Sequence, residues 1–163
     1  MKRKLIAKII LLVLIVSLMT TIFIFSHQPA DVSGEVSGGL IYRVLNFIMS
    51  GFDSLSEASR AEMVESLQFV VRKCAHAFSY ATLGGLLMGF MLTYDFKKII
   101  NGVAIAFGVA FLYAVSDEVH QLFVQGRSGQ VSDVVLDSVG AVCGICIVLL
   151  CVKLTRKRRL KKK

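Results

Sequence analysis

The chain has 163 residues but no tryptophan, one proline and four cysteines. The proline, Pro29, lies just past the first apolar run and helps to end it. The cysteines, at positions 74, 143, 146 and 151, all fall within apolar stretches, so nothing indicates a disulfide framework. Cys143 and Cys146 form a CxxC pair, but no strand or histidine pair lies beside it. We expect all four to be small, buried packing residues.

Motifs that identify common enzymes are also missing. The sequence contains no GxSxG, no P-loop, no HExxH and no Cys-His pair on the side of the membrane that we predict to be the outer one. It has no internal repeat, and its only low-complexity stretch is the basic end TRKRRLKKK. These absences argue against the familiar hydrolase, nucleotide-binding and zinc-protease classes.

The chain is instead rich in apolar residues, with a hydrophobic fraction of 55% and a mean hydropathy of +0.70. Such values indicate an integral membrane protein. Four stretches approach the ~20 apolar residues that cross a bilayer. They cover about residues 5–25, 69–94, 99–116 and 131–154. No other stretch could form a soluble core, so we predict one all-α membrane domain, residues 1–163, with four transmembrane helices.

The basic residues predict the orientation of these spans. Residues 1–8, 95–101 and 153–163 hold 14 of the 19 lysines and arginines. Under the positive-inside rule both termini are therefore cytoplasmic. The start MKRK resembles a signal peptide, but the apolar run is long and no cleavage site follows, which favours an uncleaved helix. The tail 153–163 indicates contact with anionic membrane lipid, and we predict no nucleic-acid partner.

The long piece between the first two spans, residues 26–68, has its own helical pattern. Its apolar residues recur at helical spacing at positions 40, 41, 44, 45, 47 and 48. They predict an outer amphipathic helix that lies either in the interface or over the bundle. Gly51 ends it, and Ser54 with Glu57 predicts a capping box for the next helix. Further on, glycines 85, 89, 140 and 144 would let helices approach closely.

Ionisable residues gather where the predicted spans reach the outer interface. Charges there are costly, so such a cluster is a candidate functional site. Helical spacing places Arg72, His76 and Tyr80 on one face, and likewise Asp117 with Gln121 and Asp133 with Asp137. We predict that the following residues converge as a ligand-binding site: Arg72, Lys73, His76, Tyr80, Asp117, Glu118, Gln121, Arg127, Asp133 and Asp137.

The cluster has several interpretations at this level. Arg127, in a glycine-flanked loop, suits a phosphate or carboxylate, or else pairs with Asp133. His76, Glu118 and His120 are candidates for acid–base catalysis. Polar residues also join membrane helices without any other role. Several of these side chains could ligate a metal, but their spacing matches no metal motif, so we predict no metal and no cofactor.

Three sequence pieces together resemble the VanZ-like family of small bacterial membrane proteins. They are Ser26-His27-Gln28-Pro29, RKCAHAFSYATLG from Arg72 to Gly84, and SDEVHQLFVQGRSGQVSDVVLDSVGA from Ser116 to Ala141. The resemblance extends over nearly the whole chain. Two positions depart from the family pattern: Gln125 stands where proline is common, and Asp137 where asparagine is frequent.

The resemblance implies a multi-pass protein of the bacterial cell membrane with a role in the cell envelope. The family's namesake is associated with low-level resistance to teicoplanin, a lipid-bearing glycopeptide antibiotic. We therefore expect the outer cluster to bind a lipoglycopeptide or a lipid-linked cell-wall component. The alternatives are an enzyme acting on a lipid-linked head group, and a structural partner of another membrane protein.

Overall fold

The computed structural model describes residues 2–160, apart from the side chains of residues 3, 30–33, 36 and 159. Over these residues the chain forms five α-helices and one short 3-10 helix, with no strand. They are α1 (Lys2–His27), α2 (Ala30–Ile48), η1 (Phe52–Ser54), α3 (Glu57–Met91), α4 (Ile99–Gln121) and α5 (Val131–Leu160). The all-α prediction is confirmed. The last three residues of the predicted basic tail, 161–163, lie outside the described residues.

Three of the described helices are long and apolar enough to cross a membrane. They are the segments Lys4–His27, Ile99–Gln121 and Val131–Arg158. The predicted second span lies in α3, which does not meet this criterion because polar side chains such as His76 and Tyr80 interrupt its apolar stretch. At ~1.5 Å per residue, the 35 residues of α3 extend over about 52 Å, well beyond the ~30 Å of a hydrocarbon core.

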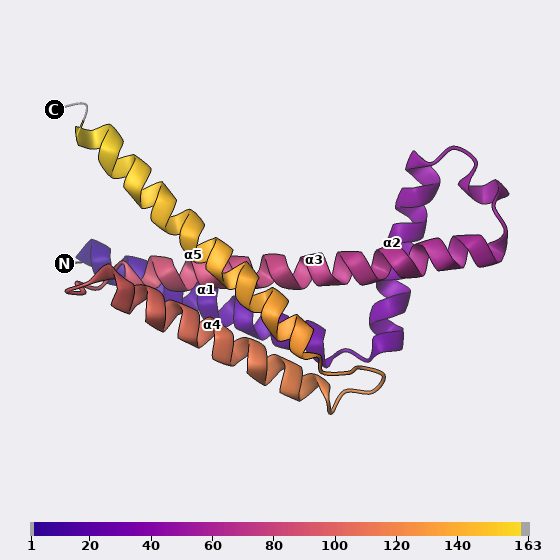
Figure 1. Cartoon of the computed structure of the whole chain (residues 1–163), viewed down its shortest axis with the longest axis horizontal. Helices are drawn as coiled ribbons and strands as arrows, with labels where there is room; N and C mark the ends of the chain where they lie inside the picture. The colour runs from indigo at the N-terminus through magenta and orange to yellow at the C-terminus, as the bar shows by residue number, and fades with distance from the viewer. Residues whose placement is uncertain (1, 161–163) are drawn as a thin grey trace.

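The core of the bundle is built around the C-terminal half of α3. Leu83, Leu87 and Met88 are buried there against three alanines of α4, at positions 106, 110 and 114. Ile15 and Ile22 of α1 and Ile145 of α5 also belong to this cluster. Because alanine is so small, α4 can lie close to α3 along this stretch. α1 begins and α5 ends at the same end of the bundle (Figure 1).

Glycines set the contact between α3 and α5, the most extensive helix pair in the molecule. A Cβ atom added to Gly144 would lie 2.7 Å from the carbonyl carbon of Ala81, and one on Gly84 would lie 2.8 Å from the Cα of Ala141. Gly140 meets the backbone of Ala77 in the same way. The predicted close approach is therefore real at 140 and 144. On α3 it involves Gly84 and, only loosely, Gly85, whose added Cβ would lie 3.6 Å from α5; Gly89 instead faces the Leu11 side chain of α1 at 3.7 Å.

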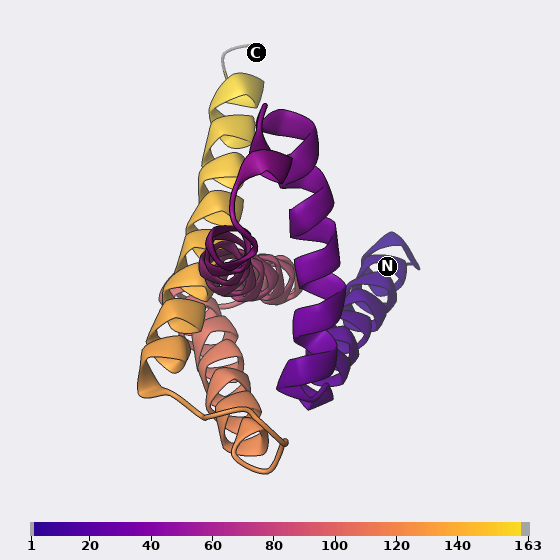
Figure 2. The same ribbon diagram turned by 90° about the vertical axis from the view of Figure 1, so that its right-hand side faces the viewer.

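α2 lies across the long axis of the bundle, beyond the end of α1 (Figures 1 and 2). It starts directly after Pro29 and covers more residues than the predicted 40–48. Its Ile41 and Leu45 pack on α3 around the buried Phe52. Gly51 turns the chain with a φ of 88°, a conformation that favours glycine.

Two sequence predictions are wrong. Ser56, not Ser54, caps α3: its hydroxyl accepts the backbone N–H of Ser59 at 3.2 Å, so no capping box forms with Glu57. The pattern was misleading because Ser54 belongs to η1, where it bonds to Gly51. The four cysteines are free and exposed, not buried. They lie on outward faces of α3 and α5, and an apolar stretch by itself does not distinguish such a face from one that packs in the core.

Candidate functional site

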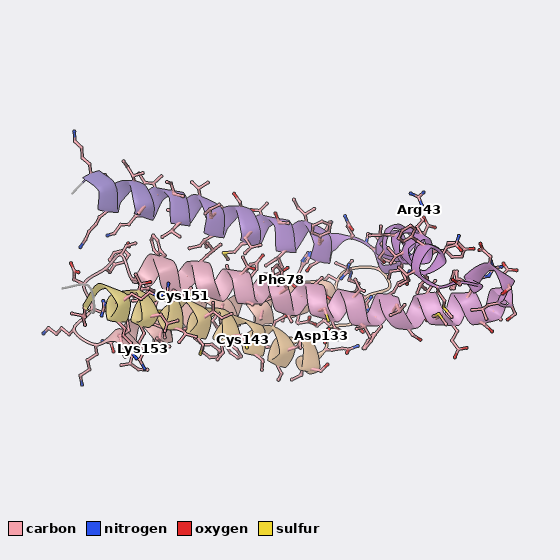
Figure 3. All side chains as sticks on the ribbon, turned by 90° about the horizontal axis from the view of Figure 1, so that it is seen from above. Arg43, Phe78, Asp133, Cys143, Cys151 and Lys153 are labelled. Atoms are coloured by element: carbon pink, nitrogen blue, oxygen red, sulfur yellow. The ribbon has the colours of Figure 1, made fainter. Side chains whose placement is uncertain are left out.

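The end of the bundle opposite to the two termini gathers most of the polar residues predicted as a site. α1 and α4 end there, α5 begins there, and α3 passes through with Arg72 and His76. Figure 3 shows Asp133 and Lys153 at opposite ends of α5. The structure thus brings together side chains that are about 60 to 100 residues apart, as the hydrogen bonds below demonstrate.

A small polar cavity of about 70 Å³ lies at this end. Three cationic side chains line it, against one carboxylate, that of Asp133. A water molecule needs ~10–15 Å³ of such volume, so the cavity has room for a group the size of a phosphate and not for a drug-sized ligand of ~300 Å³ or more. Its lining residues are Arg72, Lys73, His76, Gln121, Gly126, Arg127, Ser128, Gln130 and Asp133.

Lys73 and Asp133 form the ion pair at the wall of this cavity. Both side chains are about one-fifth exposed, at 20% and 21%. The Lys73 ammonium also lies 5.3 Å from the centre of the Phe69 ring, on the preceding turn of α3. Asp133 therefore pairs with Lys73, and the alternative pairing with Arg127 is wrong.

Arg127 binds the end of the first helix. Its Nε donates to the carbonyl of Gln28 at 2.8 Å, and its Nη2 donates to the carbonyl of Phe25 at 2.9 Å. The last carbonyls of a helix lack partners within the helix and carry partial negative charge, so a guanidinium suits them. Burial, and secondly the nearby Arg72, lower the pKa of Arg127, but an arginine keeps its charge at any physiological pH.

Two buried carboxylates hold α1, α4 and the start of α5 together. Asp117 accepts the hydroxyl of Ser26 at 2.8 Å and the amide of Gln121 at 3.3 Å. Glu118 accepts the backbone N–H of Gln130, directly before α5, at 2.8 Å. Each nevertheless keeps one buried oxygen without a hydrogen-bond partner among the described residues.

Asp137 and Tyr80 are fully buried beside this network. Within the described part of the chain, the two carboxylate oxygens of Asp137 have no hydrogen-bond partner. The hydroxyl of Tyr80 has none either. Nδ1 of His76 lies 3.7 Å from Oδ2 of Asp137. Since His76 also lines the cavity, a histidine–carboxylate pair connects the cavity with the buried groups. Unpaired buried polar atoms are rare in folded proteins and mark strained or functional positions.

His120, a predicted catalytic candidate, is not among the residues that line the cavity. Its Nε2 lies 3.1 Å from Nδ1 of His27, and its ring lies 4.7 Å from that of Phe23. It thus joins α4 to α1. Of the remaining predicted residues, Tyr80, Asp117, Glu118 and Asp137 are buried behind the cavity, and the other six line it.

The sequence reasoning missed several residues. The end of the first span, at Ser26 and Gln28, was expected at the level of the cluster, but the bond from Ser26 to Asp117 was not predicted, nor were the contact of His27 with His120 and the bond from Gln130 to Glu118. Ser26 and His27 carried a signal, since they begin the motif Ser26-His27-Gln28-Pro29. Among the described residues no three histidine, cysteine, aspartate or glutamate side chains are placed to hold a metal ion.

Comparison with known proteins agrees with the sequence motifs. A family model described as VanZ/LLP1 matches residues 11–152. The match includes all the residues that line the cavity and all the buried carboxylates. No curated protein and no solved structure matches the chain.

Proposed function

The chain belongs to the VanZ/LLP1 family, as its sequence motifs predicted, and from that membership we propose that it is a multi-pass protein of the bacterial cell membrane whose polar cavity faces outward. In this arrangement α1, α3, α4 and α5 all cross the bilayer. The basic residues support it: 14 of the 19 lysines and arginines lie near the termini and the turn from α3 to α4. The cavity is at the opposite end, at the depth of the outer head groups.

The cavity is proposed to bind an anionic head group, such as the phosphate of a lipid-linked cell-wall component or an acidic group of a lipoglycopeptide. The observation that carries this proposal is its lining, in which Arg72, Lys73 and Arg127 face a single carboxylate. Lys73 and Arg127 already have partners, whereas Arg72 has no hydrogen bond or ion pair within the described structure. Arg72 is therefore the cation most available to a ligand.

Low-level resistance to teicoplanin is the proposed consequence of such binding. The test compares the teicoplanin and vancomycin susceptibility of cells with and without the gene, and binding of a lipid phosphate to the purified protein. Arg72→Gln should weaken binding by about tenfold or more, because a hydrogen bond to a charged group contributes ~1.5–3 kcal/mol. Arg43→Gln, on α2 and outside the cavity lining, is the matched control. Equal binding by both variants would contradict the proposal.

An enzyme acting on a lipid-linked head group is the second candidate. The His76–Asp137 contact behind the cavity favours it, because a histidine oriented by a carboxylate can act as a general acid or base. The two functions differ in the effect of His76→Ala. If ligand binding survives and resistance is lost, catalysis is favoured; if both decline together, binding is favoured.

A further inference from the structure

α2 has three different sides. One side packs on α3 through Ile41 and Leu45, which are 9% and 8% exposed. A second side carries two polar residues, Tyr42 and Asn46, each directly after one of these packed residues in the sequence. The third side is apolar and uncovered. Its four residues recur at helical spacing and are Leu40 (65% exposed), Val44 (48%), Phe47 (91%) and Ile48 (67%).

The third side is an apolar surface of the kind that is normally covered by a partner or by lipid. A cluster of large exposed apolar side chains in a soluble environment usually marks a contact surface. Arg43, at its edge, is the only charged residue among positions 40 to 48. None of the described residues covers it, since Phe47 is almost fully exposed.

The position of α2 indicates what covers this side. Two residues separate the helix from the end of α1 at His27, and it lies across the bundle axis (Figures 1 and 2). The last turn of α1 still exposes Ile24 (54%) and Phe25 (59%), on the surface that membrane lipid would cover. The apolar side of α2 therefore follows directly, after the turn at Pro29, on the apolar surface at the end of α1.

We propose that α2 lies in the outer membrane–water interface, with Leu40, Val44, Phe47 and Ile48 in the lipid of the outer leaflet. The proposal rests on the topology in the proposed function. Helices of this kind bind through buried apolar area plus attraction to anionic lipid. Because this side carries one arginine and no lysine, the contact depends on apolar burial. It should therefore be the same in zwitterionic and in anionic bilayers.

The absence of tryptophan from the chain allows a direct test. Val44→Trp and Asn46→Trp each introduce the only tryptophan, and ~100° per residue places the two positions on nearly opposite sides of α2. In the full chain reconstituted into vesicles, the fluorescence of the Val44→Trp variant should shift to the blue and be quenched by brominated lipid. The Asn46→Trp variant should instead be quenched several-fold more by aqueous iodide. Phe47→Trp gives a second lipid-facing position if Val44→Trp does not fold.

Two results would overturn the proposal. Equal access of iodide to positions 44 and 46 would place the whole helix in water. Protection of position 44 from both quenchers would mean that protein, such as a second copy of the chain, covers the apolar side. Neither quenching measurement uses a head-group ligand. A negative quenching result therefore does not affect the binding test of Arg72→Gln, and a negative binding result does not affect the quenching test.

Discussion

Asp117 and Asp137 are both buried aspartates, yet they differ in their surroundings. Asp117 accepts hydrogen bonds from Ser26 and Gln121 and so connects α1 to α4. Asp137 accepts none within the described residues and has only the ring of His76 at 3.7 Å. A buried carboxylate with donors contributes to stability, whereas one without donors reduces it.

We therefore predict that Asp117→Asn and Asp137→Asn affect stability differently. Asp117→Asn replaces the charge-assisted bonds from Ser26 and Gln121 by neutral ones, or sets an amide N–H against a donor. It should lower the free energy of unfolding by about 1–2 kcal/mol. Asp137→Asn loses no such bond and should change it less. Thermal unfolding of both variants in detergent measures the difference. A larger loss for Asp137→Asn would indicate a charged His76–Asp137 pair that stabilises the bundle.

Arg127 combines a structural role with a place in the cavity lining. Lysine keeps the charge but lacks the planar fork that reaches two carbonyls at once. Arg127→Lys should therefore lower stability by about 1–3 kcal/mol, the contribution of charge-assisted bonds to Phe25 and Gln28. Arg43→Lys, at an exposed site on α2, should leave the melting temperature unchanged. Equal melting temperatures for wild type and Arg127→Lys would show that the fork is not required.

At the scale of the elements, α3 determines the arrangement of the others. It contacts each of the other four α-helices. Its C-terminal half provides the core, its middle carries Arg72, Lys73 and His76, and its N-terminal part supports α2. Because one unbroken helix does all three, the cavity is fixed relative both to the bundle and to α2.

The glycine contacts between α3 and α5 lead to a prediction at this scale. Gly144→Ala places a methyl group against the backbone at Ala81, so the two helices must separate. Overpacking of this kind costs ~1–3 kcal/mol. Gly108→Ala in α4 is the control, because nothing lies within 4 Å of its added Cβ, and alanine favours the helix by up to ~1 kcal/mol. In urea or thermal unfolding, Gly144→Ala should lower the free energy of unfolding and Gly108→Ala should raise it. A stable Gly144→Ala would contradict the close packing.

Sequence reasoning located the helices well because apolar runs and turn residues are local signals. It erred where the outcome depends on neighbours. Ser54 matches the capping-box pattern with Glu57 and Ser56 does not, yet Ser54 lies in η1 after the turn at Gly51 and Ser56 caps α3. The partner of Lys73 depended on the rotation of α3 and the partners of Arg127 on the path of the loop between α4 and α5, and the sequence pattern determines neither. Convergence of the cluster, in contrast, was predicted from the alternating direction of the helices, and six of the ten predicted residues line one cavity.

The whole molecule has two chemically different ends. Most of its basic residues lie near the termini, and the cavity with its buried acids lies at the other end. This asymmetry supports the proposed orientation. Three apolar helices that are long enough to cross a membrane, Lys4–His27, Ile99–Gln121 and Val131–Arg158, join the two ends.

The orientation can be tested with single cysteines. After replacement of the four native cysteines by serine or alanine, Ser128→Cys in intact cells should react with a membrane-impermeant thiol reagent. Thr155→Cys, near the end of α5, should react only after permeabilisation. The reverse pattern would place the cavity inside the cell, and labelling of both in intact cells would indicate mixed orientation.

The bonds from Arg127 to the end of α1 join residues 99 and 102 positions apart. In terms of biogenesis, the ribosome must complete nearly the whole chain before these bonds can form. Until the start of α5 has been made, Lys73 lacks its partner Asp133 and His76 lacks its neighbour Asp137, so two polar side chains of α3 are still without these contacts. The lining of the cavity is thus complete only when the chain has been made as far as Asp133, so the cavity can form only after α1, α3 and α4 have been synthesised.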